Sequence, residues 1–142
     1  MSIWTHVAGL IRIDTIQIPG AYVDEDNLVT RLGKISTFEE PVETKVPIGS
    51  EGSLRYEIID TDITGNSMTK WAIAIWGDLR DFDENDTDSI IKWIKKVTEG
   101  LMVRNGILTI ETEGVKTIRK ILVMTEFEVK GKKTVNNWNV IE

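Results

Sequence analysis

Hydrophobic and polar residues alternate along residues 3–14, IWTHVAGLIRID. One side of an extended chain would carry Ile3, Val7, Ile11 and Ile13, and the other side would carry Trp4, His6, Leu10 and Arg12. Successive side chains of a strand point to opposite faces of a sheet. The segment is therefore predicted to be a long β-strand with one buried face.

The alternation returns later in the chain, and two helical patterns interrupt it. Further strands are predicted at residues 53–60, 69–77, 106–113 and 117–129, with a last short strand in TVNNWNVIE. Residues 24–34 combine acidic capping residues with a stripe of leucine and valine, which predicts a short helix ending at Gly33. The segment DSIIKWIKKVTEG has the apolar stripe of an amphipathic helix, and Gly100 is expected to end it.

The predicted order of elements through residue 113 is β-α-β-β-α-β, which is typical of the ferredoxin-like split β-α-β fold. We therefore expect an α+β protein with an antiparallel sheet, two helices on one face of that sheet, and one or two extra strands at the C-terminal end. No repeat, low-complexity tract or linker divides the pattern, so residues 1–142 are expected to form a single domain.

Composition narrows the classes of function. Hydrophobic residues make up 41% and charged residues 28% of the 142 residues, as in ordinary globular domains. The net charge is −6, and general nucleic-acid binding is not expected because it requires a basic surface. There is no cysteine, which excludes disulfides, thiolate metal sites and cysteine nucleophiles. The first residues lack the features of a signal peptide, and no apolar run is long enough to span a membrane. We expect a cytoplasmic protein with no membrane contact.

Six carboxylates crowd the stretch DLRDFDENDTDS between a predicted strand and the amphipathic helix. Asp81, Asp83 and Asn85 occupy positions 1, 3 and 5 of a calcium-binding loop. The match then fails, because Asp86 stands at the glycine position and Lys92 at the position of the last carboxylate. A metal site at these three residues is the weaker interpretation of the stretch.

A helix start is the simpler interpretation of the same stretch. Asp86 or Asp88 can cap the helix by accepting a bond from a free backbone N–H, and the other carboxylates face the positive end of the helix dipole. A hydrated loop does not hold two carboxylates at the fixed separation that catalysis requires. On this interpretation no cofactor is expected.

Other chemistry is sparse. His6 is the single histidine, and we interpret it as a structural residue of its strand. The segment GSEGS at 49–53 resembles a nucleophile elbow only superficially, since its centre is Glu51; it could cup an anion or simply lead into the next strand. No phosphate-binding or dinucleotide-binding motif is present. We do not expect an enzyme.

The face of the sheet opposite the helices is the main candidate for binding. The positions of Trp71 and Trp76 differ by an odd number, so one of the two must point outward. The residues expected to bind a ligand or partner on this face are Trp4, His6, Arg12, Arg55 and Trp76. Such a face is rarely left bare. A second subunit or partner ranks first as its cover, the C-terminal strands second, and a ligand stacked on tryptophan beside arginine third.

Three segments carry a resemblance to a class of proteins. WTHVAGLIRID, PIGSEGSLRYEI and WGDLRDFD resemble segments of small uncharacterised proteins encoded by bacteriophages and prophages. The resemblance supplies no catalytic residues. It implies a phage accessory protein in the cytoplasm of the host cell. Such a protein would act by binding, for example as an inhibitor of a host-defence protein or by sequestering a small nucleotide-like ligand.

The hypothesis from the sequence is a non-enzymatic binding protein, expected to be a homo-oligomer, that contacts a host protein or traps a small ligand. One alternative is a metal-dependent, calcium-stabilised module or hydrolase that uses the acidic loop at 81–88. Another is a component of virion assembly.

Overall fold

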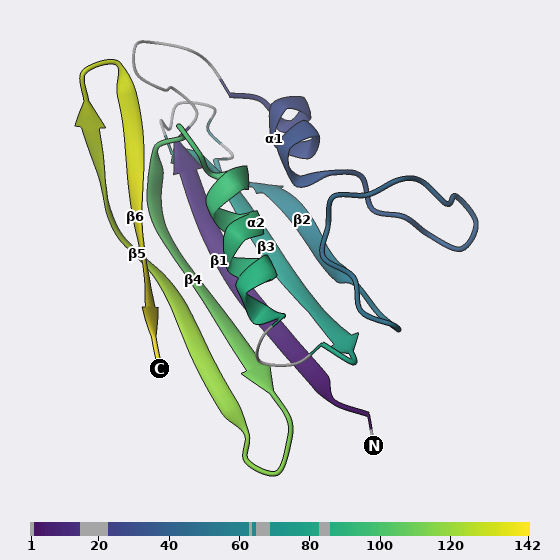
Figure 1. Ribbon diagram of the computed structural model, residues 1–142. Helices are drawn as coiled ribbons and strands as arrows, with labels where there is room; N and C mark the ends of the chain where they lie inside the picture. The colour runs from purple at the N-terminus through teal and green to yellow at the C-terminus, as the bar shows by residue number, and fades with distance from the viewer. Residues whose placement is uncertain (1, 15–22, 63, 65–68, 83–85) are drawn as a thin grey trace.

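Six strands form one antiparallel sheet, and two helices accompany it (Figure 1). The computed structural model describes residues 2–14, 23–62, 64, 69–82 and 86–142. The strands are β1 (Trp4–Asp14), β2 (Leu54–Asp60), β3 (Thr69–Arg80), β4 (Val103–Thr112), β5 (Ile118–Lys130) and β6 (Lys133–Ile141). The helices are α1 (Glu25–Leu32) and α2 (Thr87–Val97). The order of strands across the sheet is β2-β3-β1-β4-β5-β6.

The expected ferredoxin-like α+β class is wrong, because the molecule is a β-rich fold dominated by its sheet. About half of the described residues lie in strands, whereas α1 has 8 residues and α2 has 11. Only α2 runs along the middle of the sheet, while α1 is a two-turn helix near one end (Figure 1). The segments expected as C-terminal additions are full strands, β5 with 13 residues and β6 with 9, and they extend the sheet to six strands.

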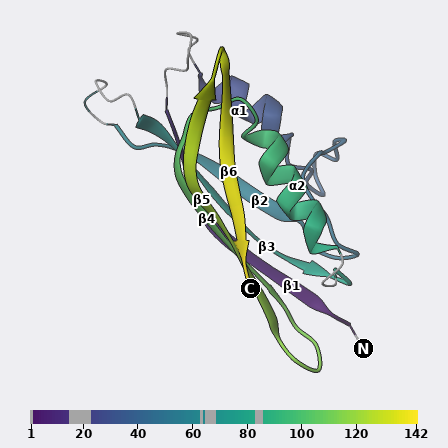
Figure 2. The same ribbon diagram turned by 60° about the vertical axis from the view of Figure 1, so that its left-hand side comes forward.

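The core lies between the sheet and the helices, which cover the same side of the sheet (Figure 2). The alternation predicted for the first strand is confirmed: Val7, Ile11 and Ile13 are buried, and Arg12 is exposed. From the helical side, α2 contributes six buried residues: Thr87, Ile90, Ile91, Trp93, Ile94 and Val97. No described helix has both the length and the apolar character needed to cross a membrane.

The two helices begin differently. Asp24 caps α1 through a capping box, in which its side chain accepts from the Asn27 N–H and Asn27 accepts from the Asp24 N–H. Asp86 is the N-cap residue of α2, as expected, but its side chain makes no capping bond. Instead, the Asp86 carbonyl oxygen accepts from both the N–H and the hydroxyl of Ser89. The acidic stretch therefore does precede the helix, but the predicted bond from the Asp86 side chain to the helix is not formed.

The C-terminal hairpin is fixed to the rest of the molecule by two residues of β6. Trp138 is 9% exposed; its Nε1 donates to Thr98 Oγ1 over 3.1 Å, and its ring lies against Gly106 of β4. The side-chain amide of Asn136 donates to the carbonyl oxygens of Thr98 and Leu101. These bonds tie β6 to the end of α2 and place the two elements side by side.

Candidate functional site

The face of the sheet that points away from the helices, called the outer face below, carries all five predicted binding residues. Side chains alternate between the two faces along β1. Trp4, His6 and Arg12 therefore point to the face opposite the one on which Val7 and Ile11 are buried. The strand registers place the residues of neighbouring strands in rows across the sheet. No described segment lies over this face, whereas α1 and α2 lie over the other (Figure 2).

Two adjacent rows of the outer face are apolar, and together they are called the apolar band. The first row consists of Trp76, Ala8, Thr109, Ile121 and Ile141, with Arg55 at its β2 end. The second row consists of Ala74, Leu10, Ile107 and Val123, between Glu57 and Asn139. Leu10 is 36%, Trp76 41%, Ile107 50% and Ile141 54% exposed. Trp76 is thus the tryptophan that points outward, while Trp71 is buried.

A charged row borders the apolar band on the side of Trp76. It contains Asp78, His6, Glu111 and Arg119 in register across four strands. His6 Nδ1 lies 2.5 Å from Asp78 Oδ1, and His6 Nε2 lies 3.5 Å from Glu113 Oε1. Arg119 binds Glu111 through both Nε and Nη2. The hydrogen bond to Asp78 is the main reason that the pKa of His6 is raised above its ordinary value of 6.5, against a lowering by burial.

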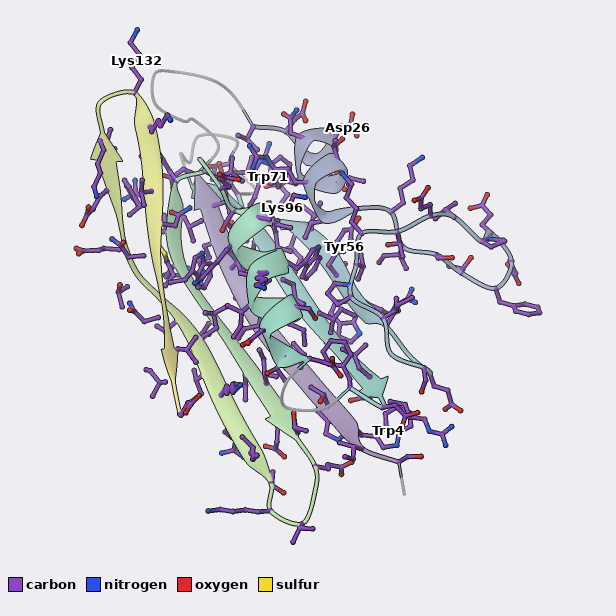
Figure 3. All side chains as sticks on the ribbon, viewed as in Figure 1. Trp4, Asp26, Tyr56, Trp71, Lys96 and Lys132 are labelled. Atoms are coloured by element: carbon purple, nitrogen blue, oxygen red, sulfur yellow. The ribbon has the colours of Figure 1, made fainter. Side chains whose placement is uncertain are left out.

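Beyond the charged row, the outer face ends with an aromatic and a basic residue in register, Trp4 on β1 and Arg80 on β3. The guanidinium of Arg80 bonds Glu51 Oε1 at 2.5 Å and the Ser2 hydroxyl at 2.9 Å. Arg80 is therefore held by its own neighbours at the rim. Trp4 lies near the N-terminal end of β1, beyond the charged row (Figure 3).

The opposite border of the apolar band carries Arg12. Its register partners are Ala72 and Asn105, and Ile59 continues the row on β2 with 38% exposure. Arg12 and Arg55 lie in different rows of the outer face, on strands that β3 separates. The structure therefore gathers the predicted residues on one face but does not place the two arginines around a single stacking position.

The predicted metal site is described only in part. Asp83 and Asn85 lie outside the described residues. Asp81 Oδ2 accepts the Ser50 hydroxyl over 2.7 Å, and the Asp81 N–H donates to the Ile3 carbonyl oxygen. Asp81 has a φ of 55°, in the left-handed region that non-glycine residues rarely adopt. Within the described part of the chain, no group of three or more histidine and acidic side chains is arranged to hold a metal ion.

The GSEGS segment closes against the end of β3 instead of cupping an anion. The Gly49 N–H donates to the Gly52 carbonyl oxygen, and the Ser50 N–H donates to the Arg80 carbonyl oxygen. A Cβ at Gly52 would lie 2.0 Å from the Asp78 carbonyl oxygen, and the φ of Gly52 is 73°. The glycine is thus required by close backbone approach. These two N–H groups are already bonded and are not free for a ligand.

Sequence reasoning missed the surroundings of His6. The strand was predicted to end at residue 77, so Asp78 was assigned to the acidic loop rather than to the sheet. The available signal was the continued alternation, since Leu79 is apolar between Asp78 and Arg80. Asp78 is the residue that holds His6 in place.

No protein-family model, curated protein or solved structure matches the chain. The function is therefore inferred from the geometry of the chain itself.

Proposed function

We propose that this protein acts by binding another protein through the outer face of its sheet, and not by catalysis. The observation that carries the proposal is the apolar band, whose exposed side chains lie side by side and are bordered by the charged row on one side and by the row of Arg12 on the other. An apolar centre with a polar rim, and with tryptophan and arginine among its residues, is the usual composition of a protein interface.

A protein fits this face better than the other classes of ligand. A nucleic acid would require a basic surface, whereas the charged row next to the band sets Asp78 and Glu111 beside His6 and Arg119 and is not basic. A small stacked ligand would require cations around one aromatic ring. Trp76 has one cation beside it, its register partner Arg55 on β2, whereas its other register partner is the small apolar Ala8 on β1.

The identity of the partner follows from two expectations. Self-association is the first, since an exposed apolar sheet face on a small domain is commonly buried by a second copy. The resemblance to phage-encoded proteins leads us to propose a host protein, met in the host cytoplasm, as the target of the resulting oligomer. Inhibition of a host-defence protein by contact is the function that combines both expectations.

The test compares the substitution of two exposed aromatic residues, one inside the apolar band and one outside it. Trp76→Ala removes the largest side chain of the apolar band, and Phe38→Ala removes a fully exposed aromatic residue of the loop between α1 and β2. We expect Trp76→Ala to weaken association at least about tenfold, as for a hot-spot tryptophan, and Phe38→Ala to leave it unchanged.

Sedimentation velocity measures self-association, and chemical cross-linking in host lysate followed by mass spectrometry measures contact with host proteins. Cross-links that map to the outer face and disappear in Trp76→Ala support the proposal. Equal association of wild type and Trp76→Ala, or cross-links confined to the helical side, would show that this face is not the binding surface.

A further inference from the structure

A hollow with a volume of about 600 Å³ lies on the other side of the molecule, between β6 and the C-terminal half of α2. One wall consists of Lys95, Glu99 and Gly100, and the other is the unbroken run of residues 132–139. A run of consecutive residues lines a hollow when the edge of a strand, with its backbone, forms the wall. The hollow is therefore a groove between a helix and the edge of a sheet.

The edge of β6 lacks the usual protection against pairing. β6 is the last strand in the sheet order, so none of the described strands pairs with its outer side. Edge strands normally carry charges, proline or bulges that prevent further pairing. Apart from Lys133 at its start, β6 contains no charged residue, and it contains no proline. The bulge in this hairpin lies on β5, between Met124 and Glu126.

The hairpin register shows which backbone groups are free. Lys130 pairs with Lys133 across a two-residue turn, and such flanking residues exchange backbone hydrogen bonds. Every second residue after them then points its N–H and C=O away from the partner strand. Between the turn and the bulge, these β6 residues are Thr134 and Asn136, and among the described residues no backbone group bonds their N–H and C=O groups from the free side of the strand. The groove is thus lined by donors and acceptors at the spacing of a strand.

The floor and walls of the groove add polar chemistry. Thr134 is 7% exposed, and neither its Oγ1 nor Asn136 Oδ1 has a hydrogen-bond partner among the described residues. Lys95 stands on the helical wall, and Lys132 and Lys133 stand at the hairpin end, against the single acidic side chain of Glu99. The groove is therefore locally cationic in a protein whose net charge is −6.

We infer that this groove binds an extended acidic peptide segment of another protein, which pairs with β6 as a seventh strand. Strand addition satisfies the free backbone groups of Thr134 and Asn136. Carboxylates of the peptide meet Lys95 on one wall and the lysines of the hairpin on the other. The groove shares only Asn139 with the rows of the outer face described above, so either proposal can fail without the other.

The experiment uses the whole protein and a fluorescein-labelled pentapeptide of alternating glutamate and valine, followed by fluorescence polarisation. Lys95→Glu is compared with the matched control Lys92→Glu, one turn earlier on α2 and outside the groove. We expect Lys95→Glu to weaken peptide binding about fivefold and Lys92→Glu to change it less than about twofold. An analogue with N-methylated backbone amides should bind about tenfold more weakly, because it loses the ladder bonds.

Amide chemical shifts locate the site. Changes confined to residues 132–139 and to the end of α2 support the proposal. Absence of peptide binding, equal binding of the N-methylated analogue, or shift changes on the outer face would each overturn it. Adenosine monophosphate serves as a competitor, and its binding in place of the peptide, with no effect of backbone methylation, would show a small-anion site instead of strand addition.

Discussion

His6 is the residue whose protonation the fold controls most directly. Its two ring nitrogens face carboxylates of different strands, Asp78 on β3 and Glu113 just after β4. The bond to Asp78 is the largest contribution to the raised pKa of His6. A raised pKa in the folded state means that the protonated histidine stabilises the fold.

The first prediction follows from the sign of this shift. An unfolded histidine has a pKa near 6.5, so below that pH His6 is charged in both states and its ion pairs contribute fully. The contribution is lost as the pH rises through the folded pKa. Urea unfolding of wild type and His6→Gln should therefore differ more at about pH 5.5 than at about pH 8.5. The His6 side chain is 42% exposed, so we expect a difference below about 1 kcal/mol.

NMR titration checks the same prediction directly, because the chain has one histidine. Asp78→Asn should lower the pKa of His6 toward 6.5, whereas Asp60→Asn, on β2 and away from His6, should leave it unchanged. A wild-type His6 pKa at or below 6.5 would contradict the assigned role of Asp78.

Gly9 is required by packing at a central position of the sheet. A Cβ at Gly9 would lie 2.2 Å from Leu108 Cδ1 and 2.3 Å from the Ile107 carbonyl oxygen. We expect Gly9→Ala to lower the free energy of unfolding by about 1–3 kcal/mol, as overpacked core substitutions do. Gly114→Ala is the control, since its Cβ would meet nothing closer than 3.6 Å. Urea denaturation of both variants measures the difference, and equal midpoints would show that β1 and β4 separate easily at this point.

Local pattern predicts most elements of this chain but not all of their ends. β1, β2 and β5 begin and end within one residue of the predicted strands, because their alternation reflects one buried and one exposed face. β3 continues to Arg80, three residues past the predicted end at Gly77. Pairing with β1 supplies hydrogen bonds to these residues. The alternation through Leu79 was a local signal for the longer strand, but it is short, and the partner strand that decides the outcome is distant in sequence. The miss matters because it hid the carboxylate that binds His6.

Trp138 sets the position of the C-terminal hairpin as an element. Its ring fills the space over Gly106, and its Nε1 bonds Thr98 beyond the end of α2. We expect Trp138→Ala to cost about 3–5 kcal/mol of unfolding free energy. Trp138→Phe should lower the free energy of unfolding by about 1 kcal/mol in addition to the effect of the smaller buried ring, because the hydrogen bond to Thr98 is lost. At a protein concentration too low for self-association, Trp76→Ala, which truncates an exposed tryptophan, should cost less than about 0.5 kcal/mol under the same urea denaturation. Comparable losses for both alanine variants would mean that Trp138 does not fix the hairpin.

The balance of sheet and helix is a property of the whole molecule, and the order of elements did not predict it. The expected class assumed a helical layer over the sheet, yet the two helices are short and the sheet has six strands. The residues that share the outer face were predicted correctly, because side chains alternate between the two faces along a strand however the strands are ordered in the sheet. Its division into apolar and charged rows could not be predicted, since rows depend on registers between strands distant in sequence.

The exposed apolar band predicts how stability depends on protein concentration. A second copy that covers Leu10 and Ile107 stabilises the folded state by mass action, so the Tm of wild type should rise when the concentration is raised about a hundredfold. The double variant Leu10→Thr/Ile107→Thr should lose this rise. At the lower concentration it should match wild type within about 0.5 kcal/mol, because both side chains are already exposed in one chain. Differential scanning calorimetry at the two concentrations makes the comparison. A large loss of stability in the double variant at low concentration would show that another part of the same chain covers this face. A wild-type Tm that does not depend on concentration would exclude self-association.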